Sequence, residues 1–114
     1  MTHITAYTPD EVAQAVANQE GLLLLHFASP LASFSTYVAE EFKLLAPPFD
    51  GRLMFGEVEI GIDDRALIRS YKIEQLPTLI LFSGGEPVER LTTPLPLPEL
   101  SSFLDAAVSF YHSD

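Results

Sequence analysis

The chain contains no cysteine among its 114 residues. Disulfides, thiolate metal ligands and thiol nucleophiles all need cysteine sulfur, so the chain as it stands has none of these three chemistries. Basic residues are also few, with 6 Lys and Arg against 16 Asp and Glu, for a formal net charge of −10. Such a charge repels phosphate groups, so we expect no nucleic acid and no anionic membrane as partner.

Signals for export and for membrane insertion are missing as well. The N-terminal segment MTHITAYTPDE lacks the positive-then-apolar profile of a signal peptide, and the apolar run LLLLHFA is too short to cross a bilayer. We therefore expect a cytoplasmic protein. The hydrophobic share of 47% and the charged share of 19% are typical of a globular chain, and we expect a single domain over residues 1–114.

Strand and helix signals alternate along the first half of the chain. Residues 2–7 (THITAY) read as a short strand, and the segment from Thr8 to Glu11 reads as a helix start with a capping box. The helix that follows has an apolar stripe at three-four spacing, formed by Val12, Ala13, Val16 and Ala17. Residues 22–28 (LLLLHFA) are apolar without alternation, which predicts a strand buried on both faces of a sheet. A second helix presents one apolar face and ends at two prolines; the face consists of Phe34, Val38, Phe42 and Leu45.

The same alternation continues in the second half and closes with a hairpin. Residues 52–60 read as a strand, and residues 63–72 as a short helix. A buried strand over residues 78–82 and an edge strand that begins at Pro87 are joined by a glycine turn. The last helix opens at Pro98, with Leu97 as a weak N-cap; its apolar face consists of Leu100, Phe103, Leu104, Ala107, Val108 and Tyr111. The order β-α-β-α-β-α-β-β-α predicts an α/β fold, with a central mixed sheet flanked by helices on both faces.

Two stretches resemble the thioredoxin family. HFASPLASFSTYV (residues 26–38) is similar to the family's strand, redox loop and helix, whose usual form is Phe-x-Ala-Pro-Trp-Cys-Gly-Pro-Cys. In this alignment Ser29 and Pro30 precede Leu31, which takes the tryptophan position, while Ala32 and Ser35 take the positions of the two cysteines. YKIEQLPTLILFSGGEPV (residues 71–88) is similar to the segment that carries the family's cis proline. The resemblance implies a thioredoxin fold in which a cis Leu76–Pro77 bond faces the loop.

The departures from the family pattern bear on activity. Thioredoxin chemistry needs a low-pKa thiolate and a second thiol that resolves the mixed disulfide. Ala32 offers no nucleophile and Ser35 only a hydroxyl, so we expect no thiol redox activity, no catalytic residue and no cofactor. His26 takes the position of the family's buried acid, and Glu57 that of its partner lysine. We interpret these two as a buried hydrogen-bonded pair with exchanged charges; alternatively, His26 bonds only to backbone or water.

Hydrolase and metal sites are poorly supported by the sequence. Ser29, Ser33 and Ser35 lie near His26, but a histidine in a strand under the loop is not poised over it, and no Gly-x-Ser-x-Gly elbow is present. No metal is expected, because the histidines do not stand at ligand spacing; these are His3, His26 and His112. Most glutamates, including Glu40, Glu41 and Glu59, are interpreted as parts of solvated faces, with Glu57 the exception.

What remains is a surface around the lost motif. The resemblance implies that extended polypeptide is held there beside the cis proline. The residues expected to bind a partner are Leu31, Ala32, Ser33, Phe34, Leu76, Pro77 and Thr93, the last at a position where the family keeps a glycine.

Three hypotheses for function follow. The first is a redox-inactive, chaperone-like or adaptor module that binds a protein or peptide client, preferably a basic one. Holdase chaperones and assembly chaperones for hydrogenase precursors are cysteine-poor members of the fold, similar to this chain in fold and lost motif only. The second is a thiol-disulfide oxidoreductase in which Ala32 and Ser35 replace the natural cysteines. The third is a subunit of a larger assembly.

Overall fold

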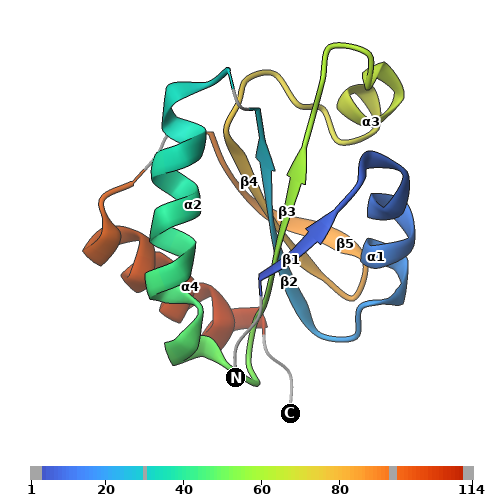
Figure 1. Ribbon diagram of the computed structural model, residues 1–114. Coiled ribbons are helices and arrows are strands. Elements are labelled where there is room, and N and C mark those ends of the chain that lie inside the picture. Colours follow the sequence, from blue (N-terminus) through green and yellow to red (C-terminus); the bar gives the residue numbers. More distant parts are fainter. Residues whose placement is uncertain (1–3, 30, 93–94, 112–114) are drawn as a thin grey trace.

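The computed structural model describes residues 4–29, 31–92 and 95–111. Five strands form one sheet, with two helices on each of its faces (Figure 1). The strands are β1 (Ile4–Tyr7), β2 (Leu22–Ala28), β3 (Met54–Glu59), β4 (Thr78–Ser83) and β5 (Glu86–Leu91). The helices are α1 (Val12–Asn18), α2 (Ser33–Leu45), α3 (Arg65–Ser70) and α4 (Leu97–Tyr111), with short 3-10 turns at Pro9–Glu11 and Pro47–Phe49.

The sheet is mixed, as the sequence predicts. Its strand order is β1-β3-β2-β4-β5, in which β1, β3 and β2 are parallel and β4 runs antiparallel to β2. β5 pairs antiparallel with β4, and its register shifts by a bulge between Leu81 and Phe82. The order of elements along the chain and the α/β class both agree with the sequence prediction.

Each face of the sheet carries its own apolar core. α2 and α4 cover one face, where Phe42 and Leu104 pack with Leu24 of β2. α1 covers the other face, where Val12 packs in a second core with Leu25. Successive residues of β2 therefore enter opposite cores, which explains why this central strand has no polar positions except His26.

Gly56 lets the three parallel strands pack closely. A Cβ atom at this position of β3 would lie 2.6 Å from Cε2 of Tyr7 in β1 and 2.8 Å from Cδ2 of Leu25 in β2. Both distances are shorter than a van der Waals contact. The small residue therefore sets the packing beside Glu57, the next residue of the strand.

Three local predictions were wrong. Phe34 does not share the buried face of α2, because its side chain is 59% exposed; spacing defines a helix face but not which turns another element covers. Ala13 and Ala17 of the predicted stripe on α1 are exposed, since the two valines alone reach the core. Leu97 is the first residue of α4 rather than its N-cap, and the amide of Leu100 bonds to the carbonyl of Pro96.

Candidate functional site

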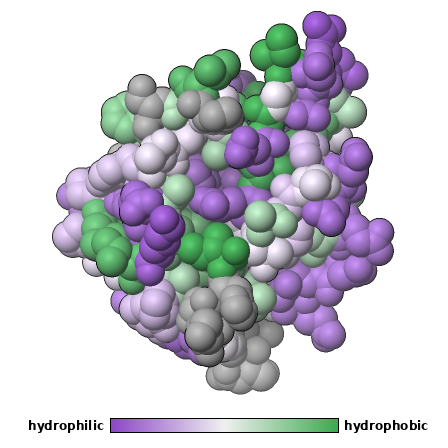
Figure 2. Space-filling view, in the orientation of Figure 1, coloured by the Kyte–Doolittle hydropathy of each residue, from purple (hydrophilic) through white to green (hydrophobic). Residues whose placement is uncertain are grey.

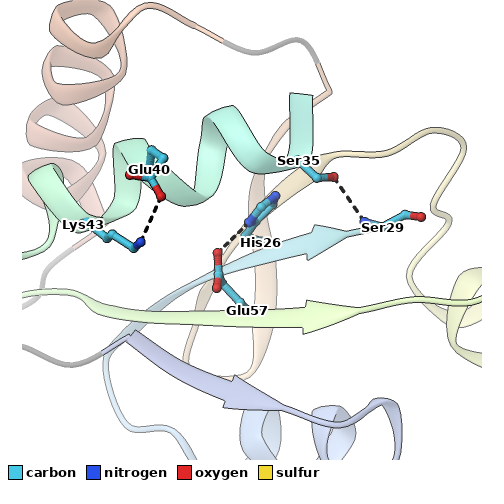
Figure 3. Close-up of polar contacts among 6 residues, drawn as sticks. All are labelled: His26, Ser29, Ser35, Glu40, Lys43 and Glu57. Carbon is cyan, nitrogen blue, oxygen red and sulfur yellow. Dashed lines mark hydrogen bonds and ion pairs between the residues drawn. The ribbon is translucent and has the colours of Figure 1, made fainter. Parts of the chain in front are cut away.

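The loop from β2 to α2 is closed by serine hydrogen bonds. The Ser29 amide donates to Oγ of Ser35 at 3.1 Å, and the Leu31 amide donates to Oγ of Ser29 at 3.2 Å (Figure 3). The backbone adds a bond from the Ala32 amide to the Ser29 carbonyl at 3.0 Å. Ser35 is buried, so its hydroxyl ties the loop to the first turn of α2 and does not cap the helix. The loop is thus a compact turn built on hydroxyls where the family keeps two thiols.

The Leu76–Pro77 peptide bond is cis, as the resemblance implies. Gln75, just before it, donates from Nε2 to the Thr92 carbonyl at 2.6 Å, and its own carbonyl accepts from the Thr78 hydroxyl at 2.6 Å. These bonds tie the segment to the first residue of β4 and to the residue that follows β5. Pro77 itself is buried, whereas Leu76 is half-buried.

A pocket of about 380 Å³ lies between this segment and the loop, and we call it the Leu31 pocket. Three of the predicted partner-binding residues line it: Leu31, Ala32 and Leu76. Leu31 is 91% exposed, so its side chain projects into solvent at the pocket rim. The remaining lining residues are Ser29, Ile68, Ile73, Glu74 and Gln75. Sequence reasoning did not assign these five to the site, because the pocket includes α3 and the turn after it, which the loop motif does not specify.

The other predicted partner-binding residues are not part of this pocket's lining. Phe34 is exposed on the first turn of α2, and Pro77 is buried. Ser33 begins α2. Thr93 lies outside the described residues, as does Pro30 of the loop.

His26 and Glu57 are in contact across neighbouring strands. Nδ1 of His26 lies 3.1 Å from Oε2 of Glu57, and the two residues are register partners of the parallel strands β2 and β3 (Figure 3). The His26 ring also packs against Phe42, with ring centroids 5.5 Å apart. His26 is fully buried, but the Glu57 side chain is 32% exposed, so only the histidine half of the expected buried pair lies in the interior. Nε2 of His26 has no hydrogen-bond partner in the described part of the chain.

A second pocket of about 370 Å³ is lined by both residues of this pair, and we call it the Glu57 pocket. It lies between α2 and the parallel strands. Its polar lining includes Tyr7, His26, Ser29, Ser35, Glu57 and Glu59. Ser29 lines both pockets, so the two adjoin across the loop.

With this geometry established, comparison with known proteins identifies the family. A family model described as thioredoxin matches residues 3–106. The chain belongs to the thioredoxin family. It is 26% identical over 106 residues to a protein named thioredoxin from Haemophilus influenzae and to one named thioredoxin 1 from Nostoc sp.; each match covers 92% of this chain and 97% of the relative. A protein named thioredoxin H2-2 from Oryza sativa subsp. japonica is 26% identical over 90 residues, which are 78% of this chain and 65% of that protein.

This thioredoxin-family member has one acid whose environment the sequence prediction misjudged. Glu41 of α2 was expected on a solvated face, but it is only 4% exposed. Both of its carboxyl oxygens are buried and have no hydrogen-bond partner among the described residues. Burial raises the pKa of the Glu41 carboxyl above its ordinary value of 4.5.

The described part of this thioredoxin-family chain has neither a metal-ligand cluster nor a membrane-spanning helix. Within residues 4–29, 31–92 and 95–111, no three His, Asp or Glu side chains group as they would around a metal ion. Two of the three histidines, His3 and His112, lie outside that part. None of the helices that the structure describes is long and apolar enough to cross a membrane.

Proposed function

We propose that this thioredoxin-family chain is a redox-inactive protein-binding module, of the chaperone or adaptor kind, that acts in the cytoplasm. It binds an extended segment of a client polypeptide at the Leu31 pocket. The observation that carries the proposal is the exposure of Leu31, 91%, beside an apolar pocket in a loop without thiols. An exposed leucine that borders a concave apolar surface is typical of a binding site.

The surroundings of the Leu31 pocket support this proposal. Figure 2, in the orientation of Figure 1, shows hydrophobic side chains at the end of the molecule where β2 leads into α2, and further hydrophobic patches elsewhere on the same face. Phe34 and Tyr37 extend the exposed apolar area along α2. Within the pocket, Ser29, Glu74 and Gln75 add polar groups to a lining whose other members are apolar, so a backbone can be hydrogen-bonded while side chains are buried.

Substitution of the two pocket leucines tests the proposal. A fluorescent, unstructured and uncharged peptide rich in Leu and Val is the probe, and fluorescence polarisation measures its binding. We expect Leu31→Asp and Leu76→Asp each to weaken binding by about thirtyfold, as for a central interface residue. Leu44→Asp is the matched control, because Leu44 is 65% exposed at the other end of α2 and should leave binding unchanged.

The proposal fails if both pocket variants bind the peptide as the unmodified chain does. It fails equally if Leu44→Asp weakens binding as much as they do, because the interaction would then be non-specific. The redox part is tested separately. Dithiothreitol reduces the disulfides of insulin at its own rate, and the chain should not accelerate this reduction.

A second candidate function is thiol-disulfide exchange by a form with cysteines at positions 32 and 35. The observation in its favour is the similarity to relatives named thioredoxin, together with a Ser35 that sits on the first turn of α2 beside Ala32. A double variant, Ala32→Cys with Ser35→Cys, tests it. Accelerated insulin reduction by this variant would support an oxidoreductase scaffold, and a dithiol without activity would count against it.

A further inference from the structure

The Glu57 pocket has the components of a site for a cation. Two carboxylates line it, Glu57 and Glu59, which stand two residues apart on β3 and therefore on one face of the strand. Ala6, Ala28 and Ala39 supply small apolar walls. The chain as a whole carries a net charge of −10, so a cationic ligand is favoured over an anion at long range.

His26 provides an independent observation that points to a hydrogen-bond donor in this pocket. It lines the pocket, is fully buried, and has an Nε2 without a partner among the described residues. The tautomer that donates Nδ1–H to Glu57 leaves Nε2 as an acceptor. A buried acceptor without a donor costs free energy, so a donor that enters the pocket, directly or through a water molecule that it holds, is stabilised there.

We propose that the Glu57 pocket binds a primary ammonium group carried on an aliphatic stem, the chemistry of a lysine side chain. An ammonium has three donors on a compact charge, so it can bond to the carboxylates of Glu57 and Glu59 directly and donate toward Nε2 of His26 through a water molecule. The methylene stem packs against the alanine walls, as lysine stems do on apolar surface.

The chain's own nearby ammonium is engaged elsewhere. Nζ of Lys43 on α2 bonds to Oε2 of Glu40 at 2.9 Å (Figure 3). This hydrogen bond and the charge of Glu40, followed by the charge of Glu57, raise the pKa of the Lys43 ammonium. Lys43 thus lies within the field of Glu57 but bonds to Glu40, which leaves the Glu57 carboxylate to His26 and to a ligand.

The ammonium site would recognise a lysine of the client, and this role rests on the proposed function. Because Ser29 lines both pockets, a client segment whose apolar side chain occupies the Leu31 pocket can place a neighbouring lysine in the Glu57 pocket. The predicted client is then an extended segment with a lysine next to a large apolar residue. Binding of a free amine does not depend on that second step.

The test uses n-butylammonium as the probe and n-butanol as its uncharged counterpart. Nuclear magnetic resonance of the His26 imidazole follows the titration at constant pH and ionic strength. We expect saturable shifts with n-butylammonium, with a Kd on the order of 1 to 10 mM for so small a ligand, and none with n-butanol. Glu57→Gln and Glu59→Gln should each weaken the response by about tenfold, as for the loss of a charged hydrogen-bond partner. Glu74→Gln, an acidic residue of the Leu31 pocket, is the matched control and should leave it unchanged.

Equal shifts with n-butanol would overturn the proposal, because the pocket would then bind any short aliphatic chain. An n-butylammonium response unaltered in both Glu57→Gln and Glu59→Gln would overturn it as well. Leu31→Asp separates the two proposals: it should weaken peptide binding about thirtyfold and preserve the amine response at His26. If instead the amine response is lost and uncharged peptide still binds, the proposed function stands and the ammonium site does not.

Discussion

At the scale of single residues, the exchange of charge between positions 26 and 57 is the clearest departure from the family pattern. The resemblance to the family implies that His26 takes the position of a buried acid and Glu57 that of its partner lysine. The parallel pairing of β2 and β3 places the two side by side, and Nδ1 of His26 lies 3.1 Å from Oε2 of Glu57. The pair therefore satisfies a buried polar group in a chain that has no thiol to titrate.

Removal of the acceptor should destabilise the fold more than removal of its charge. Glu57→Ala leaves Nδ1 of the buried His26 without its partner. Loss of a partner by a buried polar group costs about 1 to 3 kcal/mol in the free energy of unfolding. We expect about 1 kcal/mol here, because the Glu57 side chain is partly solvated. Glu57→Gln keeps an acceptor oxygen and should cost less than half as much. Urea unfolding followed by circular dichroism measures both. Equal stabilities for the two variants and the unmodified chain would contradict a structural role for the contact.

Motif residues of the site could be predicted from the sequence, but their surroundings could not. The resemblance over the redox loop identified Leu31 and Ala32, and the resemblance over the cis-proline segment identified Leu76. Neither identified Ser29 as the residue shared by two pockets. That role depends on the hydroxyl of Ser35, which the sequence alone does not direct toward the loop.

At the scale of elements, α2 carries a buried carboxyl that its sequence pattern could have revealed. Glu41 stands three residues after Val38 and four before Leu45, and both of these are buried. Residues at these spacings share a helix face, so Glu41 lies on the core side despite its polarity. The interpretation as a solvated face rested on residue type, whereas position relative to the core decides burial.

Replacement of this carboxyl by an apolar side chain should stabilise the protein. Glu41→Met is expected to raise the free energy of unfolding at pH 7 by about 1 to 3 kcal/mol, because it removes a buried carboxyl whose desolvation the neighbouring Tyr37 hydroxyl offsets only in part. The folded-state pKa of Glu41 is raised above 4.5, so its carboxyl favours folding below pH 4.5 and this contribution is lost as the pH rises through the folded pKa. The stability advantage of the methionine variant should therefore grow between pH 4.5 and pH 7.

Urea unfolding at both pH values measures this difference. Glu40→Met is the matched control, because Glu40 is the adjacent acid on the same helix and its side chain is 65% exposed. Its effect should be small at either pH. A Glu41→Met advantage that does not change with pH would contradict the assignment of a raised pKa to this group.

The order and type of the elements were predictable, because the spacing of apolar residues and the position of turn residues such as glycine and proline indicate the same elements along most of the chain. The apolar run of β2 indicated a central strand, and the glycine turn after β4 indicated the hairpin. Helix faces were predicted less well at their ends. Phe34 has the spacing of the buried stripe yet lies in the first turn of α2, where it stays exposed.

At the scale of the whole molecule, the net charge of −10 is concentrated in a chain whose longest extent is 39 Å. Like charges at these separations repel one another, and compact states are disfavoured by that repulsion. We expect the free energy of unfolding to rise when NaCl increases from about 10 to about 150 mM, because the screening length falls from about 30 to about 8 Å. Thermal unfolding at the two salt concentrations measures the effect.

A variant with reduced charge provides the control for the salt effect. Replacement of the exposed acids Asp10, Glu20 and Glu86 by lysine changes the net charge from −10 to −4, since each substitution adds two units. Its stability should depend less on salt than that of the unmodified chain. An identical salt dependence would show that specific ion binding, and not general repulsion, is responsible.

The two edge strands of the sheet, β1 and β5, have features that disfavour pairing with strands of other chains. An unpaired strand edge can recruit another strand and start aggregation. β5 interrupts its free edge with Pro87 and a bulge in its pairing with β4, and β1 is only four residues long. The proposed binding of unfolded client segments would require strand edges that such segments cannot extend, and both edges of this sheet have that property.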